Sequence, residues 1–360
     1  MSAGGNHTCA LTPAGDAYCW GTNDYGEIGD GVAIEVTTRS DPRRVRPTPV
    51  AGGRRFKAIT AGNNHTCAIT LEGAAYCWGS NVLGQLANGT VTQTCRHFFN
   101  GDSACSSTPV PVDSDLAFES IDAGANHTCA LTSRGRAYCW GVNSVGQLGD
   151  GTTVGRTIPT AVAGGLSFQA LSGGFLRYTC GLTVSGAIYC WGTGLAAGPQ
   201  AAQASTVPVP VMAGMTFVAF SARSNHTCAL GAGGDLSCWG SNQSGQLGDR
   251  SFVDRAAAVA VAGDRTFARV STGPQRSCAI TPSGQAYCWG SAFQGVLGTD
   301  APTQPCVGGF ESCLTEPAPV TGGLVFVAIT LGDDHSCGLA ANGAAYCWGE
   351  NAYAQLGIDR

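Results

Sequence analysis

Seven copies of the triplet Cys-Trp-Gly constrain the fold of this chain more than any other feature of its sequence. Every tryptophan lies in such a triplet, and the copies recur about every fifty residues, with the tryptophans at positions 20, 78, 140, 191, 239, 289 and 348. Each unit also offers about four short strand segments. A four-stranded sheet cannot bury both faces alone, and radial stacking of such sheets buries them. The sequence therefore predicts an all-β fold, one seven-bladed β-propeller domain that spans residues 1–360.

The triplet belongs to a longer hairpin pattern. The fullest copies read His-Thr-Cys-Ala-Leu, a five-residue turn with a glycine, and then Ala-Tyr-Cys-Trp-Gly. Glycine suits this turn because a short hairpin loop needs a residue at positive φ. We expect seven blade hairpins, near residues 7–21, 65–79, 127–141, 178–192, 226–240, 276–290 and 335–349.

Eighteen cysteines accompany the hairpins, and seven pairs of them share the spacing i, i+10 within a hairpin. Residues that flank a hairpin turn symmetrically face each other on neighbouring strands, close enough for a disulfide. The seven expected hairpin disulfides are Cys9–Cys19, Cys67–Cys77, Cys129–Cys139, Cys180–Cys190, Cys228–Cys238, Cys278–Cys288 and Cys337–Cys347. The remaining four cysteines should close two longer loops, as Cys95–Cys105 and Cys306–Cys313. Reduced cysteines in a cytosolic propeller are one alternative, and zinc binding is another, although the chain contains no Cys-x-x-Cys knuckle.

The composition limits which classes of partner and which cellular compartment we expect. The net charge is -5 with a single lysine, Lys57, which gives no attraction to nucleic acid. No apolar run is long enough to span a bilayer, and residues 1–7 lack the features of a signal peptide. Because so many cysteines indicate an oxidising compartment, we expect an extracellular or cell-surface protein whose export signal lies upstream of residue 1.

The elements His-Thr-Cys-Ala-Leu, Trp-Gly-x-Asn and Gly-Gln-Leu-Gly resemble regulator-of-chromosome-condensation repeats, and the resemblance covers nearly the whole chain. The cysteine-rich form is similar to that of bacterial members. The family includes a nuclear exchange factor for a small GTPase, a plant photoreceptor and a bacterial inhibitor of β-lactamases, so the resemblance implies a binding face without fixing the partner. The blade of Trp191 departs from the repeat, since residues 192–198 replace the Gly-Gln-Leu-Gly loop.

Five histidines recur at one position of the repeat, and Tyr178 and Arg276 replace histidine in the other two blades: His7, His65, His127, His226 and His335. A ring of imidazoles could bind a metal or sense pH. Because the position belongs to the repeat signature, we expect these side chains to form structural hydrogen bonds, and we expect no metal or other cofactor.

Three segments between blades are long, at residues 30–47, 87–108 and 299–317. All follow the Gly-Gln-Leu-Gly element, so we expect them on one rim, in a sector around the closure of the ring. Rigid loops that expose apolar groups suit a binding surface. The candidate binding residues are the apolar and imidazole side chains of two insertions and a basic cluster in the third: His97, Phe98, Phe99, Phe310, Arg43, Arg44 and Arg46.

These features favour a monomeric, non-catalytic recognition module that binds a protein or a glycan through this rim. No nucleophile elbow, phosphate loop or paired-carboxylate cluster is present. A secreted enzyme with a site in the central depression is the alternative, and convergence of polar residues from several blades would favour it. Nucleotide exchange and chromatin binding are disfavoured because the exchange factor's basic tail has no counterpart here.

The closure of the ring lacks a segment. Seven hairpins are present, but only six Pro-Val strands and six Phe-containing strands lie between them. We expect blade 7 to lack its outer strand and blade 1 to lack most of its inner strand. Residues upstream, a strand donated by a partner, or nothing at all could occupy the gap.

Overall fold

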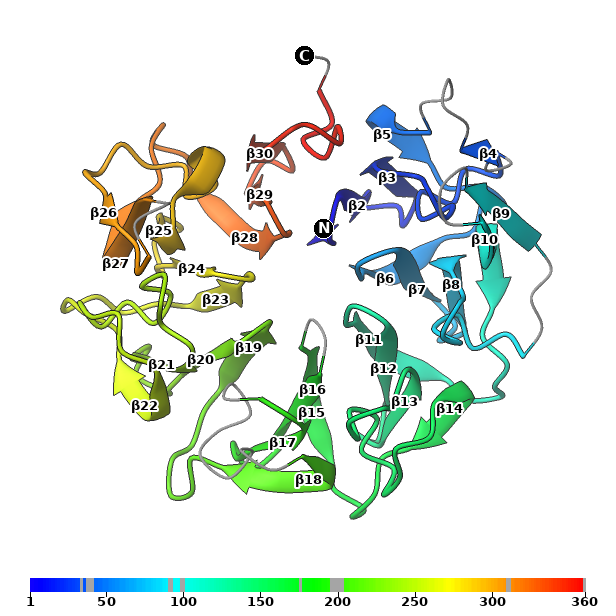
Figure 1. The fold of residues 1–360 in the computed structure, drawn as a ribbon, viewed down its shortest axis with the longest axis horizontal. Helices are drawn as coiled ribbons and strands as arrows, with labels where there is room; N and C mark the ends of the chain where they lie inside the picture. Colours follow the sequence, from blue (N-terminus) through cyan, green and yellow to red (C-terminus); the bar gives the residue numbers. More distant parts are fainter. Residues whose placement is uncertain are drawn as a thin grey trace.

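The computed structural model describes residues 1–32, 35–36, 42–89, 93–97, 101–174, 177–194, 204–308 and 312–358, without the side chains of residues 35, 36, 96, 97 and 101. In this part of the chain the regular elements are β-strands and one short 3-10 turn, η2 (Phe293–Gly295). Seven sheets surround a central axis like the blades of a propeller, as the repeat predicts (Figure 1). None of the described helices is long and apolar enough to cross a membrane.

Each blade is an antiparallel meander whose strands run from the axis outward. Blade 1 consists of β1 (Ser2–Ala3), β2 (His7–Leu11), β3 (Ala17–Gly21) and β5 (Arg44–Pro49). Blade 2 contains β6 (Phe56–Ala61), β7 (His65–Thr70), β8 (Ala75–Ser80) and β10 (Gly101–Pro111). Blade 3 consists of β11 (Phe118–Ala123), β12 (His127–Thr132), β13 (Ala137–Gly141) and β14 (Arg156–Ala161). Blade 4 consists of β15 (Phe168–Gly173), β16 (Tyr178–Thr183), β17 (Ile188–Gly192) and β18 (Ser205–Val211). Blade 5 contains β19 (Ala219–Arg223), β20 (His226–Leu230), β21 (Leu236–Gly240) and β22 (Arg255–Ala260). Blade 6 contains β23 (Arg269–Thr272), β24 (Arg276–Ile280), β25 (Ala286–Ser291) and β27 (Ser312–Pro319). Blade 7 consists of β28 (Phe326–Leu331), β29 (His335–Ala340) and β30 (Ala345–Gly349).

The second and third strands of every blade pair in the predicted register. In each of the seven hairpins the first cysteine lies directly opposite the second. The Cα atoms of each pair are 4.1 Å apart. All seven expected hairpin disulfides are confirmed: Cys9–Cys19, Cys67–Cys77, Cys129–Cys139, Cys180–Cys190, Cys228–Cys238, Cys278–Cys288 and Cys337–Cys347. The loop disulfides Cys95–Cys105 and Cys306–Cys313 are confirmed as well, which leaves none of the eighteen cysteines free.

The hydrophobic core lies between neighbouring blades. Trp140 of β13 is fully buried, packs on Phe118 of its own blade, and donates its indole N–H to the backbone carbonyl of Gln85 in the preceding blade, 2.9 Å away. The hydroxyl of Thr128 also donates to this carbonyl. Trp20, Trp78, Trp191, Trp289 and Trp348 make the equivalent bond to the blade before them. The Gly-Gln-Leu-Gly loop is therefore the part of each unit that joins consecutive blades.

The closure is incomplete, as the element count predicts. Blade 7 has three strands, and the inner strand of blade 1 is only Ser2–Ala3. Blade 7 still contacts blade 1, because Trp20 donates its indole N–H to the carbonyl of Gln355 at 3.0 Å. In the other blades, residues equivalent to Tyr346 and Cys347 pair with an outer strand, whereas no described residue pairs with this edge of β30 in blade 7.

All three long segments add strands to the outer edges of blades. The segment after β8 forms β9 (Gln93–His97), which pairs with β10, and β4 (Glu35–Val36) from blade 1 pairs in parallel with β9. The segment after β25 forms β26 (Gln304–Pro305), which pairs with β27. Figure 1 shows the two extended edges on either side of the closure, as expected from the sequence.

The two faces of the ring differ. On one, which we call the turn face, the hairpin turns keep one length (12–16, 70–74, 132–136, 183–187, 231–235, 281–285, 340–344). On the other, the insertion face, inner strands end and third strands connect to outer strands. These connections range from residues 193–204 in blade 4 to residues 22–43 in blade 1. The large differences in length therefore lie on the insertion face.

Candidate functional site

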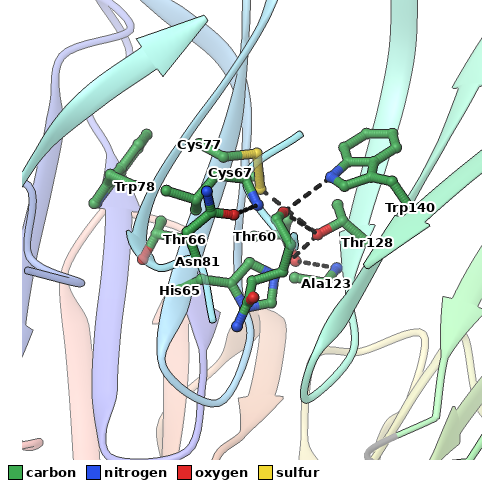
Figure 2. Close-up of a disulfide and its surroundings, with 12 residues drawn as sticks. Thr60, His65, Thr66, Cys67, Cys77, Trp78, Asn81, Ala123, Thr128 and Trp140 are labelled. Carbon is green, nitrogen blue, oxygen red and sulfur yellow. Dashed lines mark hydrogen bonds between the residues drawn. A yellow bond between two sulfur atoms is a disulfide. The ribbon is translucent and has the colours of Figure 1, made fainter. Parts of the chain in front are cut away.

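A ring of polar side chains surrounds the axis near the insertion face. Each inner strand places one such residue directly opposite the first hairpin cysteine: Ser2, Thr60, Asp122, Ser172, Ser221, Ser271 and Thr330. We call these seven residues the inner ring. In six of them the side-chain oxygen accepts a hydrogen bond from a backbone N–H of the next blade. Thr60, for instance, accepts from the N–H of Ala123 at 3.1 Å (Figure 2). The ring thus connects successive blades, including blade 7 to blade 1.

Asp122 is the single carboxylate of the inner ring. Its Oδ2 accepts the N–H of Gly173 at 2.5 Å. Burial raises the pKa of Asp122 to about 6, although the Gly173 N–H and the charge of Arg223 act in the opposite direction. Asp122 is the inner-ring group that carries charge near neutral pH and can exchange a proton there.

Arg223 reaches across the axis from blade 5. The equivalent position is glycine in the other blades, as at Gly124. Its Nη1 donates to the carbonyls of Ala3, at 2.9 Å, and Leu331, at 2.8 Å. Its Nη2 lies 3.8 Å from Oδ1 of Asp333. Because Ala3 and Leu331 belong to blades 1 and 7, Arg223, the last residue of β19 in blade 5, connects the two sides of the closure.

These residues enclose a polar pocket of about 130 Å³ on the axis, lined by the inner ring and by Arg223. The hydroxyl of Ser172 donates to the carbonyl of Ala222, and the hydroxyl of Ser221 accepts the N–H of Thr272, both in the next blade. Among the described residues, no three His, Cys, Asp or Glu side chains gather closely enough to hold a metal ion.

A second cavity, of about 240 Å³, lies between blades 6 and 7 on the same face. Its lining combines apolar and charged groups: Pro274, Gln275, Arg276, Ser291, Phe293, Val296, Asp333 and Asp334. Arg276 occupies the histidine position of the repeat and is almost fully buried. Its two Nη atoms donate to the carbonyls of Gly332, Asp333 and His335. Arg276 therefore replaces the usual histidine–threonine contact by three bonds to the next blade.

The recurring histidines form hydrogen bonds, as expected, and these bonds join blades. The Nε2 of His65 lies 2.9 Å from the Oγ1 of Thr128 in the next blade (Figure 2). The other four repeat this contact, and His335 makes it with Thr8 across the closure. Burial lowers the pKa of His65 to about 3, so the ring is neutral at physiological pH.

The predicted basic cluster has structural partners. Arg44 forms an ion pair with Asp30, 2.6 Å away, and the pairs Arg156–Asp150 and Arg255–Asp249 repeat it in blades 3 and 5. Arg43 donates to the carbonyl of Ala352 in blade 7 and so links the two sides of the closure. Arg46 lies on β5 and is exposed.

The aromatic binding candidates fall outside the described residues. This holds for Phe98, Phe99 and Phe310, and for the side chain of His97, whose backbone ends β9. The disulfides beside them are described. Cys95–Cys105 joins β9 to β10, and Cys306–Cys313 connects the end of β26 with β27.

Sequence reasoning missed Asp122, Arg223 and Asp333. Their signal was present in the sequence, since Asp122 replaces a serine or threonine, Arg223 replaces a glycine, and Asp333 stands where blade 2 has an asparagine. What the linear sequence lacks is the closed ring, which brings these residues of blades 3, 5 and 7 to one centre.

Comparison with known proteins agrees with this architecture. The family model described as the RCC1-like domain matches residues 1–260, and the model of the regulator of chromosome condensation (RCC1) repeat matches residues 326–355. The ultraviolet-B receptor UVR8 of Arabidopsis thaliana is 32% identical over 199 residues, 53% of this chain and 40% of that protein. The human E3 ubiquitin-protein ligase HERC2 is 30% identical over 201 residues, 53% of this chain and 4% of that protein. The matched part is thus less than half of either relative.

Solved structures share the fold. Prp20p of Saccharomyces cerevisiae superimposes with a TM-score of 0.81 at 22% identity, over 98% of this chain and 85% of that one. Human WBSCR16 gives 0.77 at 20% identity, over 94% of this chain and 86% of that one. With a family model that matches most of its length and a ring of repeats in the structure, this chain belongs to the RCC1-like domain family.

Proposed function

We propose that this chain is a non-catalytic recognition module, outside the cell or at its surface, that binds a protein partner as a monomer through the insertion face. The observation that carries the proposal is the difference between the two faces. The turn face repeats one turn in every blade, whereas the long connections, the charged departures from the repeat and both cavities lie on the insertion face. A surface that varies on a constant scaffold is typical of binding sites.

The insertions are built as rigid additions. A disulfide and five consecutive residue pairs hold β9 against β10, and Cys306–Cys313 closes the strand pair β26–β27. The strands that flank the tips are therefore held together before a partner binds. Nine disulfides support the oxidising compartment, and relatives with this fold bind proteins, since the structure of Prp20p was described with its binding to Gsp1p and histones.

We place the contact at the insertion tips, with His97, Phe98, Phe99 and Phe310 as apolar and imidazole contacts. Arg44 and Arg46 lie on β5, the outer strand of blade 1, and Arg43 directly precedes it. The ion pair with Asp30 holds Arg44 in place, so we assign it to the rim of the interface. The uncovered edge of β30 is a further place where a partner strand could pair.

The test begins with capture of partners from the native secretome on the immobilised chain, followed by affinity measurement with the purified partner. A triple variant, Phe98→Ser, Phe99→Ser and Phe310→Ser, should abolish binding with little change in melting temperature. The matched control replaces three exposed apolar residues of the turn face, Leu71, Val184 and Val325, by serine, and should bind like the parent chain.

Each of the following results would count against part of the proposal. Loss of binding in the control alone would place the interface on the turn face and contradict the proposal. Binding that disappears when the partner is enzymatically deglycosylated would show a glycan ligand. A large loss of stability in the first variant would show that the three phenylalanines belong to the core.

One observation favours a secreted enzyme as a second candidate. Asp122 and Arg223 converge from two blades on the axis, Asp333 of a third blade lies beside Arg223, and burial raises the pKa of Asp122 to about 6. Turnover of a small substrate that is lost in Asp122→Asn, with an unchanged melting temperature, would support this alternative.

A further inference from the structure

Exposed apolar side chains lie in the turns directly after the third strands of blades 6, 7 and 2, while Val154 and Val253 are exposed further along the same connections in blades 3 and 5. In the loops that follow the third strands, blade 6 exposes Phe293 (47%), blade 7 exposes Tyr353 (43%), and blade 2 exposes Val82 and Leu83. Tyr25 of blade 1, between them, is half-buried. Blades 3 and 5 expose Ser144 and Gln243 at this level instead. We call the loops 22–27, 81–86, 292–297 and 351–356 the docking sector.

The docking sector is continuous because each loop holds the next blade. The carbonyl of Val296 accepts the indole N–H of Trp348, at 3.0 Å, which fixes blade 6 to blade 7. The equivalent bonds of Trp20 and Trp78 fix blade 7 to blade 1 and blade 1 to blade 2. Arg43 adds a bond to Ala352, next to Tyr353.

In blade 6, the loop after the third strand lacks the side chains that hold the equivalent loop of blade 3. In blade 3, Asn143 holds its loop by accepting the N–H of Leu148, and Gln147 accepts the N–H of Val145. In blade 6 these positions are Ala292 and Val296, which cannot make such bonds, and the loop contains the 3-10 turn η2. The cavity of about 240 Å³ lies here, with Phe293 and Val296 in its lining.

Carboxylates surround the cavity on the side of blade 7. The turn reads Gly-Asp-Asp-His at 332–335, where blade 2 has Gly-Asn-Asn-His at 62–65. The backbone carbonyl of Asp334 accepts the backbone N–H of Glu350 at 2.8 Å. In the described part of the chain neither carboxylate has a hydrogen bond or an ion pair, while Asp333 lies beside Arg223.

The charges around the cavity favour a cation. The cavity lining holds two carboxylates, Asp333 and Asp334, and one guanidinium group, Arg276. The guanidinium group of Arg276 donates to backbone carbonyls, and Arg223, outside the lining, lies beside Asp333. The carboxylate of Asp334 and the aromatic ring of Phe293 are the groups that attract an ammonium or guanidinium group. The aliphatic stem of a lysine or arginine suits the apolar wall of Phe293 and Val296.

A buried donor in the cavity lining lacks an acceptor. The Nε of Arg276 is buried and has no hydrogen-bond partner. An unpaired buried donor is costly, and a peptide carbonyl would satisfy it. A peptide segment with a basic residue supplies both the acceptor and the cation, which a simple amine or a metal ion would not.

We propose that the docking sector binds a segment of the partner protein that carries a lysine or arginine, whose side chain enters the cavity between blades 6 and 7. This inference rests on the proposed function and specifies the partner's chemistry. The apolar residues of the segment contact Tyr353, Val82 and Leu83, and its cation lies beside Asp334, Glu350 and Phe293.

The experiment titrates the isotope-labelled full chain with Nα-acetyl-lysine methylamide and follows backbone amide shifts by NMR. Shifts should concentrate at 273–276, 291–297 and 332–335. The double variant Asp334→Asn, Glu350→Gln should weaken binding about tenfold, since it removes both carboxylate contacts of the cation. Phe293→Ser should weaken it about fivefold.

Two controls match these changes. Asp264→Asn removes a carboxylate, and Val325→Ser removes an exposed apolar group, both on the turn face, and neither should change the affinity for the probe. Nα-acetyl-glutamate methylamide should bind the parent chain more weakly than the lysine probe.

Equal affinity for the lysine and glutamate probes, or an affinity that the double variant leaves unchanged, would overturn the inference. The proposed function would stand in that case, provided that the partner loses affinity in the triple phenylalanine variant. If the double variant binds the probe weakly and the partner about tenfold more weakly, the inference is supported.

Discussion

Glu27 replaces a glutamine of the repeat at a fully buried position, and we predict that this makes the stability of the ring depend on pH. Its Oε2 accepts the N–H of Tyr25 at 2.7 Å, and its Oε1 has no partner. Its carbonyl accepts the indole N–H of Trp78 and the hydroxyl of Thr66, so the loop joins blades 1 and 2. Gln85, Gln147, Gln246 and Gln355 occupy the same position in other blades and make the same side-chain contact without a charge.

The size of the expected change in stability follows from the pKa of Glu27. Burial, assisted by the charge of Asp24, raises the pKa of Glu27 from 4.5 to about 7, although hydrogen bonds to its carboxylate oppose the shift. One pKa unit corresponds to about 1.4 kcal/mol, so this difference amounts to roughly 3 kcal/mol. Because the folded-state pKa lies above the unfolded one, the folded chain binds the proton more tightly. This contribution to stability is complete below pH 4.5 and is lost as the pH rises through about 7.

The variant Glu27→Gln should therefore match the parent chain near pH 4 and exceed it by roughly 3 kcal/mol at pH 8. The assay is guanidinium unfolding with disulfides intact, at intervals from pH 4 to 8, evaluated as the difference between variant and parent so that other titrating groups cancel. Gln85→Glu, the reverse change in blade 2, should lose stability at pH 8. A gain that is equal at both ends of the pH range would refute the reasoning, because it would not come from ionisation.

Three further predictions concern the ring as a whole. Alkylation without reductant followed by mass analysis should find no free thiol, and several modified cysteines in folded protein would contradict the disulfide assignment. Hydrogen exchange should show residues 1–21 and 335–358 opening at lower free energy than the central blades, because β1 is short and β30 lacks an outer neighbour, whereas uniform protection would refute this. Burial lowers the pKa of His226 to about 3 from 6.5, so the folded state binds protons less readily than the unfolded chain. Its contribution is complete above pH 6.5 and is lost as the pH falls toward the folded value, so His226→Gln should move the acid-unfolding midpoint, followed by circular dichroism, to lower pH.

The architecture could be predicted from the sequence because the same local pattern of residues recurs seven times. The Cys-Trp-Gly triplet predicts the third strand of every blade, and the spacing between Cys129 and Cys139 predicts a hairpin disulfide that the register confirms. Blade 4 was assigned from its cysteine pair, Cys180 and Cys190, and Trp-Gly alone, and it forms the expected four strands. The missing strands at the closure followed from counting elements, a method that needs no side-chain geometry.

The candidate site was much harder to predict. Arg276 was recognised as a substitute for histidine, but its three bonds to blade 7 depend on a neighbour that lies about fifty residues away in the sequence. The same holds for Arg223, whose acceptors Ala3 and Leu331 become neighbours only when the ring closes. Arg44 looked like part of a basic patch, yet the equivalent pairs at Arg156 and Arg255 show a repeated ion pair.

Hydrogen–deuterium exchange of the chain with and without its purified partner tests most directly whether the insertion face is the binding surface. We predict that the partner protects residues 22–31, 81–89, 292–308 and 332–335, all on the insertion face in blades 1, 2, 6 and 7. The turns 12–16, 70–74, 132–136 and 281–285, on the opposite face, should exchange at the same rate in both samples. Protection of these turns, with the insertion-face loops unchanged, would contradict the account.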